Sequence, residues 1–103
     1  MERELKVNSP ITITTIDNEP RVLDTDLGEA LGFDRPRAIR HLIDRNLEEL
    51  EGYGSLATQR GESRGQTFTA YYLNEQQATL VCMFARTERS AEVRRQVIRM
   101  FTA

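Results

Sequence analysis

The chain has 103 residues, of which 39% are hydrophobic and 29% charged, and its formal net charge is −2. This length is enough for one compact core and the apolar content excludes a disordered chain, so one folded domain is expected over residues 1–103, with residues 1–9 disordered. A charged N-terminus and the lack of a run of about 18 apolar residues argue against a signal peptide and a membrane span, which predicts a cytoplasmic protein without membrane contact.

The first predicted element is a β-hairpin. Residues 11–16 are rich in β-branched side chains, which favour a strand. The turn-forming residues 17–20 follow, and residues 21–23 can return as the second strand.

A pair of short helices is predicted next. From Asp24 the apolar residues recur at helical spacing, Asp24, Thr25 or Asp26 can cap the first turn, and Gly32 ends the helix. In the second helix Asp34 is the expected cap and Pro36 is tolerated in the first turn. The buried stripe of this helix is expected to consist of Ile39, Leu42 and Ile43. The opposite, exposed face is expected to carry Arg37, Arg40, His41 and Asp44. The two helices resemble a helix-turn-helix unit.

A second hairpin is predicted in the middle of the chain. Residues 46–51 favour a further helical turn that glycines close. Residues 55–59 and 67–73 then favour two strands around a polar, glycine-containing loop at residues 60–65. Tyr71 and Tyr72 fall on opposite faces of the second strand, so one is expected in the core and the other at the surface.

Two helices are predicted at the end of the chain. Asn74 and Gln77 have the spacing of a capping box, and Thr87 or Ser90 can cap the last helix. The buried stripe of the last helix is expected to contain Val93, Val97, Met100 and Phe101. Its other side is expected to display Arg94, Arg95 and Arg99. The whole pattern predicts a small α+β domain with a winged helix-turn-helix-like core, two β-hairpins and two C-terminal helices.

Two segments carry a resemblance to a known family. The segments VLDTDLGEALGF (residues 22–33) and PRAIRHLI (residues 36–43) resemble the helix-pair core of the BRO-N domain and of phage Rha/antirepressor proteins. YYLNEQQA (residues 71–78), with RT (residues 86–87) and RRQV (residues 94–97), is similar to the strand-helix-helix ending of the same group. The resemblance covers residues 11–101. It implies a mixed α and β domain, gene regulation in temperate phages or large DNA viruses and, in several members, DNA binding by this module. For such a protein, the expected location is the host bacterial cytoplasm.

Arginine dominates the basic residues, since all but one of the 14 are arginine. The planar guanidinium group binds phosphate and guanine through two hydrogen bonds, which favours a nucleic-acid partner. The candidate DNA-binding residues are Arg35, Arg37, Arg40 and His41 on the second helix, Arg60 and Arg64 on the second hairpin as a wing, and Arg94 on the last helix. The alternative is that these arginines form surface ion pairs and that the hairpin is a mobile loop.

Other functions find less support in the sequence. His41 is the single histidine, no Cys/His grouping has metal-ligand spacing, and no nucleotide-binding or nucleophile motif is present, so neither an enzyme nor a cofactor is expected. Capping and the helix dipole account for Asp24, Asp26 and Glu29. Cys82 lies in an apolar run, which predicts a buried thiol.

The main alternative function is protein binding. An antirepressor could hold a basic repressor through acidic residues at Glu48, Glu49 and Glu51, or the chain could inhibit a host defence complex. A homodimer is compatible with either function, because a single reading helix gains specificity when its half-site is doubled.

Overall fold

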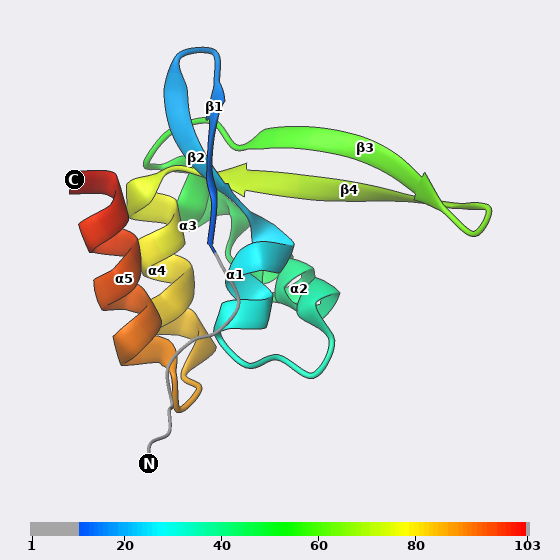
Figure 1. The fold of residues 1–103 in the computed structure, drawn as a ribbon. Coiled ribbons are helices and arrows are strands. Elements are labelled where there is room, and N and C mark those ends of the chain that lie inside the picture. The colour runs from blue at the N-terminus through cyan, green and yellow to red at the C-terminus, as the bar shows by residue number, and fades with distance from the viewer. Residues whose placement is uncertain (1–10, 103) are drawn as a thin grey trace.

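Two antiparallel hairpins form the sheet of this protein, for which a computed structural model describes residues 11–102. The strands are β1 (Ile13–Ile16), β2 (Glu19–Leu23), β3 (Ala57–Ser63) and β4 (Gln66–Leu73), in the spatial order β1-β2-β4-β3. The helices pack together beside the sheet, while much of β3 and β4 extends past them as a two-stranded arm (Figure 1). We call residues 59–69 the arm. The predicted disorder of residues 1–9 falls outside the described residues.

Both hairpins close through two-residue turns. Asp17 and Asn18 have φ of 54° and 66°, and Arg64 and Gly65 have φ of 53° and 79°. Positive φ at both central residues is typical of the type I′ turn, whose twist matches that of the flanking strands. The predicted loop over residues 60–65 was therefore wrong in extent, because β3 continues to Ser63.

The glycine at position 61 accounts for the wrong extent of the predicted loop. Gly61 suggested a loop, yet it lies inside β3 and pairs with Phe68 of β4. The Phe68 ring occupies the place where a side chain at position 61 would begin. An aromatic ring that covers a strand glycine compensates for the missing side chain, so glycine is compatible with a strand here.

The helices after β2 are short. They are α1 (Asp24–Ala30), the 3₁₀ turn η1 (Pro36–Ala38), α2 (Ile39–Arg45) and α3 (Leu47–Glu51). Gly32, with φ of 90°, follows the end of α1 as predicted. The predicted caps were wrong, since the residues before α1 and η1 are Leu23 and Arg35 and neither helix has a side-chain cap.

The last two helices are α4 (Glu75–Ala85) and α5 (Ser90–Thr102). The predicted capping box is confirmed: Asn74 Oδ1 accepts from the Gln77 N–H at 2.8 Å, and Gln77 Oε1 accepts from the Asn74 N–H at 2.9 Å. In the turn before α5, the Thr87 N–H donates to Ser90 Oγ at 2.7 Å and the Arg89 N–H donates to Thr87 Oγ1 at 3.3 Å. Both predicted capping residues therefore accept a hydrogen bond from a backbone N–H in this turn.

The core lies between the sheet and the helices. Ile39 and Ile43 of α2 and Val93 and Val97 of α5 are buried as predicted, whereas Leu42, Met100 and Phe101 only pack against the core from its margin. The α+β class with two hairpins and two C-terminal helices is confirmed. The winged helix-turn-helix interpretation of α1, η1 and α2 stays a prediction.

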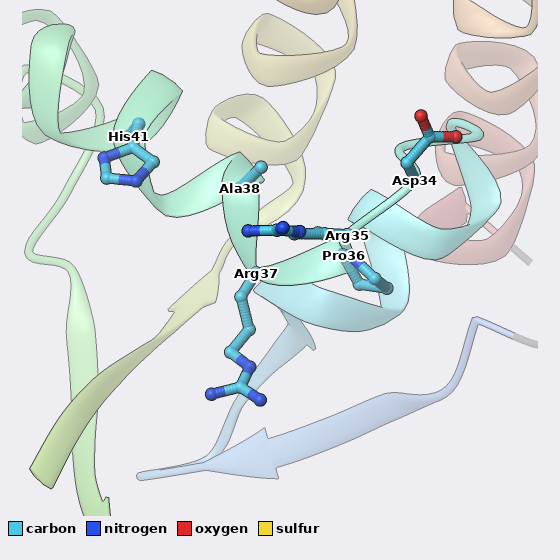
Figure 2. Close-up of a pocket in the computed structure, with 6 residues that line it drawn as sticks. All are labelled: Asp34, Arg35, Pro36, Arg37, Ala38 and His41. Atoms are coloured by element: carbon cyan, nitrogen blue, oxygen red, sulfur yellow. The ribbon is translucent and has the colours of Figure 1, made fainter. Parts of the chain in front are cut away.

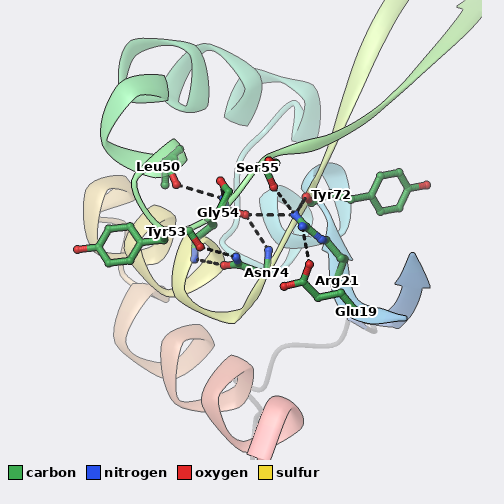
Figure 3. Close-up of polar contacts among 9 residues, drawn as sticks. Glu19, Arg21, Leu50, Tyr53, Gly54, Ser55, Tyr72 and Asn74 are labelled. Atoms are coloured by element: carbon green, nitrogen blue, oxygen red, sulfur yellow. Dashed lines mark hydrogen bonds and ion pairs between the residues drawn. The ribbon is translucent and has the colours of Figure 1, made fainter. Parts of the chain in front are cut away.

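A buried polar network joins distant parts of the chain (Figure 3). Arg21 of β2 donates from Nη1 to the carbonyls of Ser55 at 2.9 Å and Tyr72 at 3.0 Å, and from Nη2 to Glu19 Oε1 at 2.8 Å. The fully buried Gln77 donates from Nε2 to two carbonyls of the segment that leads into β3, those of Leu50 at 3.1 Å and Gly54 at 2.8 Å. These bonds hold β2, α4 and the start of β3 together.

The two tyrosines of β4 differ from their prediction. Tyr71 and Tyr72 are both half-buried, and both hydroxyls are hydrogen-bonded, to Asp44 Oδ1 at 2.7 Å and to Gln59 Oε1 at 3.0 Å respectively. A phenol at the edge of a core keeps its ring in apolar contact and its hydroxyl in polar contact, so neither ring is fully in the core or fully exposed. The bond to Asp44 raises the pKa of Tyr71 to about 12.

Candidate nucleic-acid interface

The turn from η1 into α2 forms a basic corner of the molecule. Arg35, Arg37 and His41 line an open depression of about 700 Å³, together with Asp34, Pro36 and Ala38 (Figure 2). Ile39 and Ile43 anchor this turn in the core, which leaves Arg37 and His41, four residues apart, on its outer side. We call Arg35, Arg37 and His41 the basic corner.

The basic corner is open to solvent and to a ligand. All three side chains are exposed, and within residues 11–102 none of them forms an ion pair. Asp34 lines the same depression, but its carboxylate is directed away from the guanidinium groups of Arg35 and Arg37 (Figure 2). Guanidinium groups without carboxylate partners are suited to bind phosphate oxygens through charge-assisted hydrogen bonds.

Arg40 does not belong to this exposed set. Its Nε lies 2.7 Å from Asp24 Oδ2 and its Nη2 3.3 Å from Oδ1, while the guanidinium group stacks 5.1 Å from the centroid of the Phe68 ring. Only 16% of the Arg40 side chain is exposed. The prediction that it projects from the exposed face of α2 was wrong, because the buried carboxylate of Asp24 requires a cation.

Asp24 therefore has a different role from the expected one. Its side chain is completely buried, and Oδ2 also accepts a 3.0 Å hydrogen bond from the Tyr71 N–H of β4. The capping explanation was wrong for this residue. Its neighbour Asp26 has a raised pKa, mainly because of burial and secondarily through the charges of Glu29 and Asp24, while a backbone hydrogen bond from Thr12 acts in the opposite direction.

The arm lies next to the basic corner. Arg37 also lines a second depression of about 350 Å³, to which Glu62, Ser63 and Phe68 of the arm contribute. Arg64 lies in the turn at the tip of the arm, and Arg60 lies on β3, two residues before Glu62. The structure thus brings Arg37 next to the arm, whereas Arg60 lies beside an acidic residue of its own strand.

Arg94 lies apart from the other predicted site residues. It is half-buried on α5, which Figure 1 shows on the side of the helical layer away from α2. Its charge acts instead on the buried Cys82 of α4, whose pKa it lowers slightly against the larger effect of burial. The predicted residues therefore do not form one continuous basic surface.

The thiol of Cys82 is expected to be unreactive in the folded protein. Burial raises the pKa of Cys82 to about 12, so almost no thiolate is present at pH 8. A thiol reagent such as a chromogenic aromatic disulfide should release no colour from the native protein at pH 8, and one equivalent after unfolding in denaturant. Rapid release from the native protein would contradict this.

Neither a metal-binding cluster nor a membrane span is found in the part of the chain that is described. Among residues 11–102, no three or more His, Cys, Asp or Glu side chains are placed to hold a metal ion. No described helix has the length and apolar character needed to cross a membrane. Three exposed carboxylates, those of Glu48, Glu49 and Glu51, do lie on α3.

Comparisons with known proteins add no relative: no family model, no curated protein and no solved structure matches this chain. The function is therefore inferred from the geometry of the basic corner and the arm.

Proposed function

We propose that this domain is a gene-regulatory module of the phage or prophage type, and that it binds duplex DNA through the basic corner and the tip of the arm. The observation that carries the proposal is the depression of about 700 Å³ lined by Arg35, Arg37 and His41, which form no ion pair within residues 11–102. Arg40 is left out of this surface because Asp24 holds it. Arg94 is left out because it lies on α5.

The arm supports a nucleic-acid partner over a small ligand. The arm carries the exposed Arg64 in the turn at its tip, from where its guanidinium group can contact the phosphate backbone of a duplex. The basic corner lies at the side of the arm, where phosphates of the same duplex could reach it. The net charge of −2 is compatible with this arrangement because carboxylates collect elsewhere, as on α3.

Binding to DNA is expected to depend on salt. Each phosphate neutralised by a cation contributes about −0.9 to the slope of log K, the logarithm of the binding constant, against log salt concentration. Three such phosphate contacts therefore predict an affinity that falls about 40-fold between about 50 and 200 mM salt. The measurement is fluorescence anisotropy with a labelled random duplex. Binding that does not change with salt, or no binding at about 50 mM, would overturn the proposal.

Variants of the basic corner test where the duplex is held. Arg37→Ala should weaken binding about tenfold at about 50 mM salt and reduce the salt slope by about one, because one phosphate contact is lost. Arg99→Ala removes the same charge from an exposed site on α5 and should leave both quantities unchanged. Equal effects of the two substitutions would mean that only net charge matters and that the basic corner is not the interface.

A second candidate function rests on the acidic side of the molecule. The exposed carboxylates of Glu48, Glu49 and Glu51 would suit a basic repressor or host protein. If no duplex binds at low salt, while a basic partner co-purifies and is lost when these three residues are changed to glutamine, this function replaces DNA binding.

A further inference from the structure

The outer edge of the arm is a free strand edge. β3 is the last strand of the sheet and, within residues 11–102, pairs only with β4. In Figure 1, β4 runs on the side of the arm nearer the helices and β3 on the far side. The free edge of β3 therefore lies on the side of the arm away from the helices, although Glu62 shares a depression with Arg37.

The register of the hairpin shows which backbone groups are free. Ser63 and Gln66 flank a two-residue turn, so they form a hydrogen-bonded pair, and every second pair along the ladder, including Gly61 with Phe68, does the same. The intervening residues Arg60 and Glu62 consequently direct their N–H and C=O groups away from β4. Tyr71 confirms this alternation: although it pairs with Thr58, its N–H donates to Asp24 and not to β3.

The charges along this edge are complementary to those of a second copy. Arg60 and Glu62 are exposed, carry opposite charges and, being two residues apart, lie on the same face of the strand. When two β3 strands pair antiparallel about a two-fold axis at Gly61, Arg60 of each copy lies opposite Glu62 of the other. The same register pairs the free backbone groups of these two residues in both directions.

We infer that β3 is a homodimer interface in which two arms pair antiparallel about Gly61. Sheet edges are commonly protected by charged side chains, especially lysine, which disfavour pairing with a second copy. This edge has charges of both signs in the order that favours one antiparallel register. Gly61 at the axis has no side chain, and the Phe68 ring occupies the place where one would begin, so no side chain at this position holds the two backbones apart.

The partner copy would lie alongside the arm and would pair with β3, which contains no residue of the basic corner. In an antiparallel pair the tip of one arm lies beside the base of the other, so the two helical layers lie at opposite ends of the joined arms. Arg35, Arg37 and His41 are on η1 and α2 and take no part in the pairing. The inference therefore does not rest on the proposed DNA binding, and Arg60 belongs to this interface and not to the DNA surface.

Exchanging the charges of Arg60 and Glu62 tests the register directly. The strength of the dimer is measured by analytical ultracentrifugation of the whole chain between about 10 μM and 1 mM. Glu62→Arg places like charges opposite each other at both pairs and should weaken the dimer about tenfold or more, as should Arg60→Glu. The double variant R60E/E62R restores opposite charges and should dimerise like the original protein. An equimolar mixture of R60E and E62R should form a heterodimer, although each alone is largely monomeric.

Three outcomes would overturn the inference. They are a monomeric original protein at 1 mM, a dimer that the single substitutions do not weaken, and a double variant that is folded by circular dichroism but remains monomeric. Substitution of Glu92 by arginine on α5 is the control, since it makes the same charge change away from β3. If the protein is monomeric but binds duplex DNA, the dimer inference fails and the proposed function stands.

Discussion

Replacing Asp24 by alanine should destabilise the protein by about 3 kcal/mol or more, because removing one partner of a buried ion pair leaves the other charge without compensation. Asp24 is fully buried and accepts three hydrogen bonds, two from Arg40 and one from the Tyr71 N–H. Without it, a guanidinium group that is 16% exposed and a backbone N–H both lose their partner. For a chain of this size the unfolding midpoint should fall by about 12 °C or more.

Further variants at Asp24 and Arg40 separate the stability lost with the charge from the stability lost with packing. Asp24→Asn keeps one acceptor oxygen and should lose less stability than D24A. The double variant D24A/R40A should be more stable than the sum of the single losses predicts, because neither side chain is left as an unpaired charge. Asp34→Ala, at an exposed carboxylate, should change stability by less than about 0.5 kcal/mol. Equal effects of D24A and D34A in thermal unfolding would show that the ion pair does not stabilise the fold.

Replacing Gln77 by alanine should cost about 3 kcal/mol. The amide accepts from the Asn74 N–H and donates to the carbonyls of Leu50 and Gly54, all within 3.1 Å. Each buried group left without a partner costs about 1 to 3 kcal/mol, and the removed side chain also leaves a cavity in a fully buried position.

The neighbouring glutamine supplies a matched control for this second experiment. Gln76 is exposed on the same helix, so Gln76→Ala should change the free energy of unfolding by less than about 0.5 kcal/mol, as measured with urea by circular dichroism. A loss for Q77A no larger than that for Q76A would contradict the role of the network around α4.

Local patterns in the sequence predicted much of the fold. The capping box of Asn74 and Gln77 depends on residues three positions apart, and both hairpins depend on turn residues next to their strands. The grouping of Arg37 and His41 likewise follows from a four-residue helical spacing. These features could be predicted because each depends on a few consecutive residues.

Contacts between distant residues could not be predicted in this way. Arg40 pairs with Asp24 across 16 positions, and Arg21 reaches carbonyls 34 and 51 positions away. The helical period places Arg40 on the outer side of α2, but it does not show that a buried carboxylate lies there. Gly61 was assigned to a loop for a similar reason, since the ring that covers it comes from Phe68 on the other strand.

The order of the strands has a consequence for how this chain folds. Each hairpin closes through a two-residue turn and involves only local contacts, which form within about 1 to 10 μs in isolated hairpins. The sheet is complete only when Val22 meets Leu73, and this contact closes a loop that contains α1, α2, α3 and β3. The entropy lost in closing that loop must be overcome before the β2–β4 pairing contributes stability, so we expect the meeting of the two hairpins to limit the folding rate.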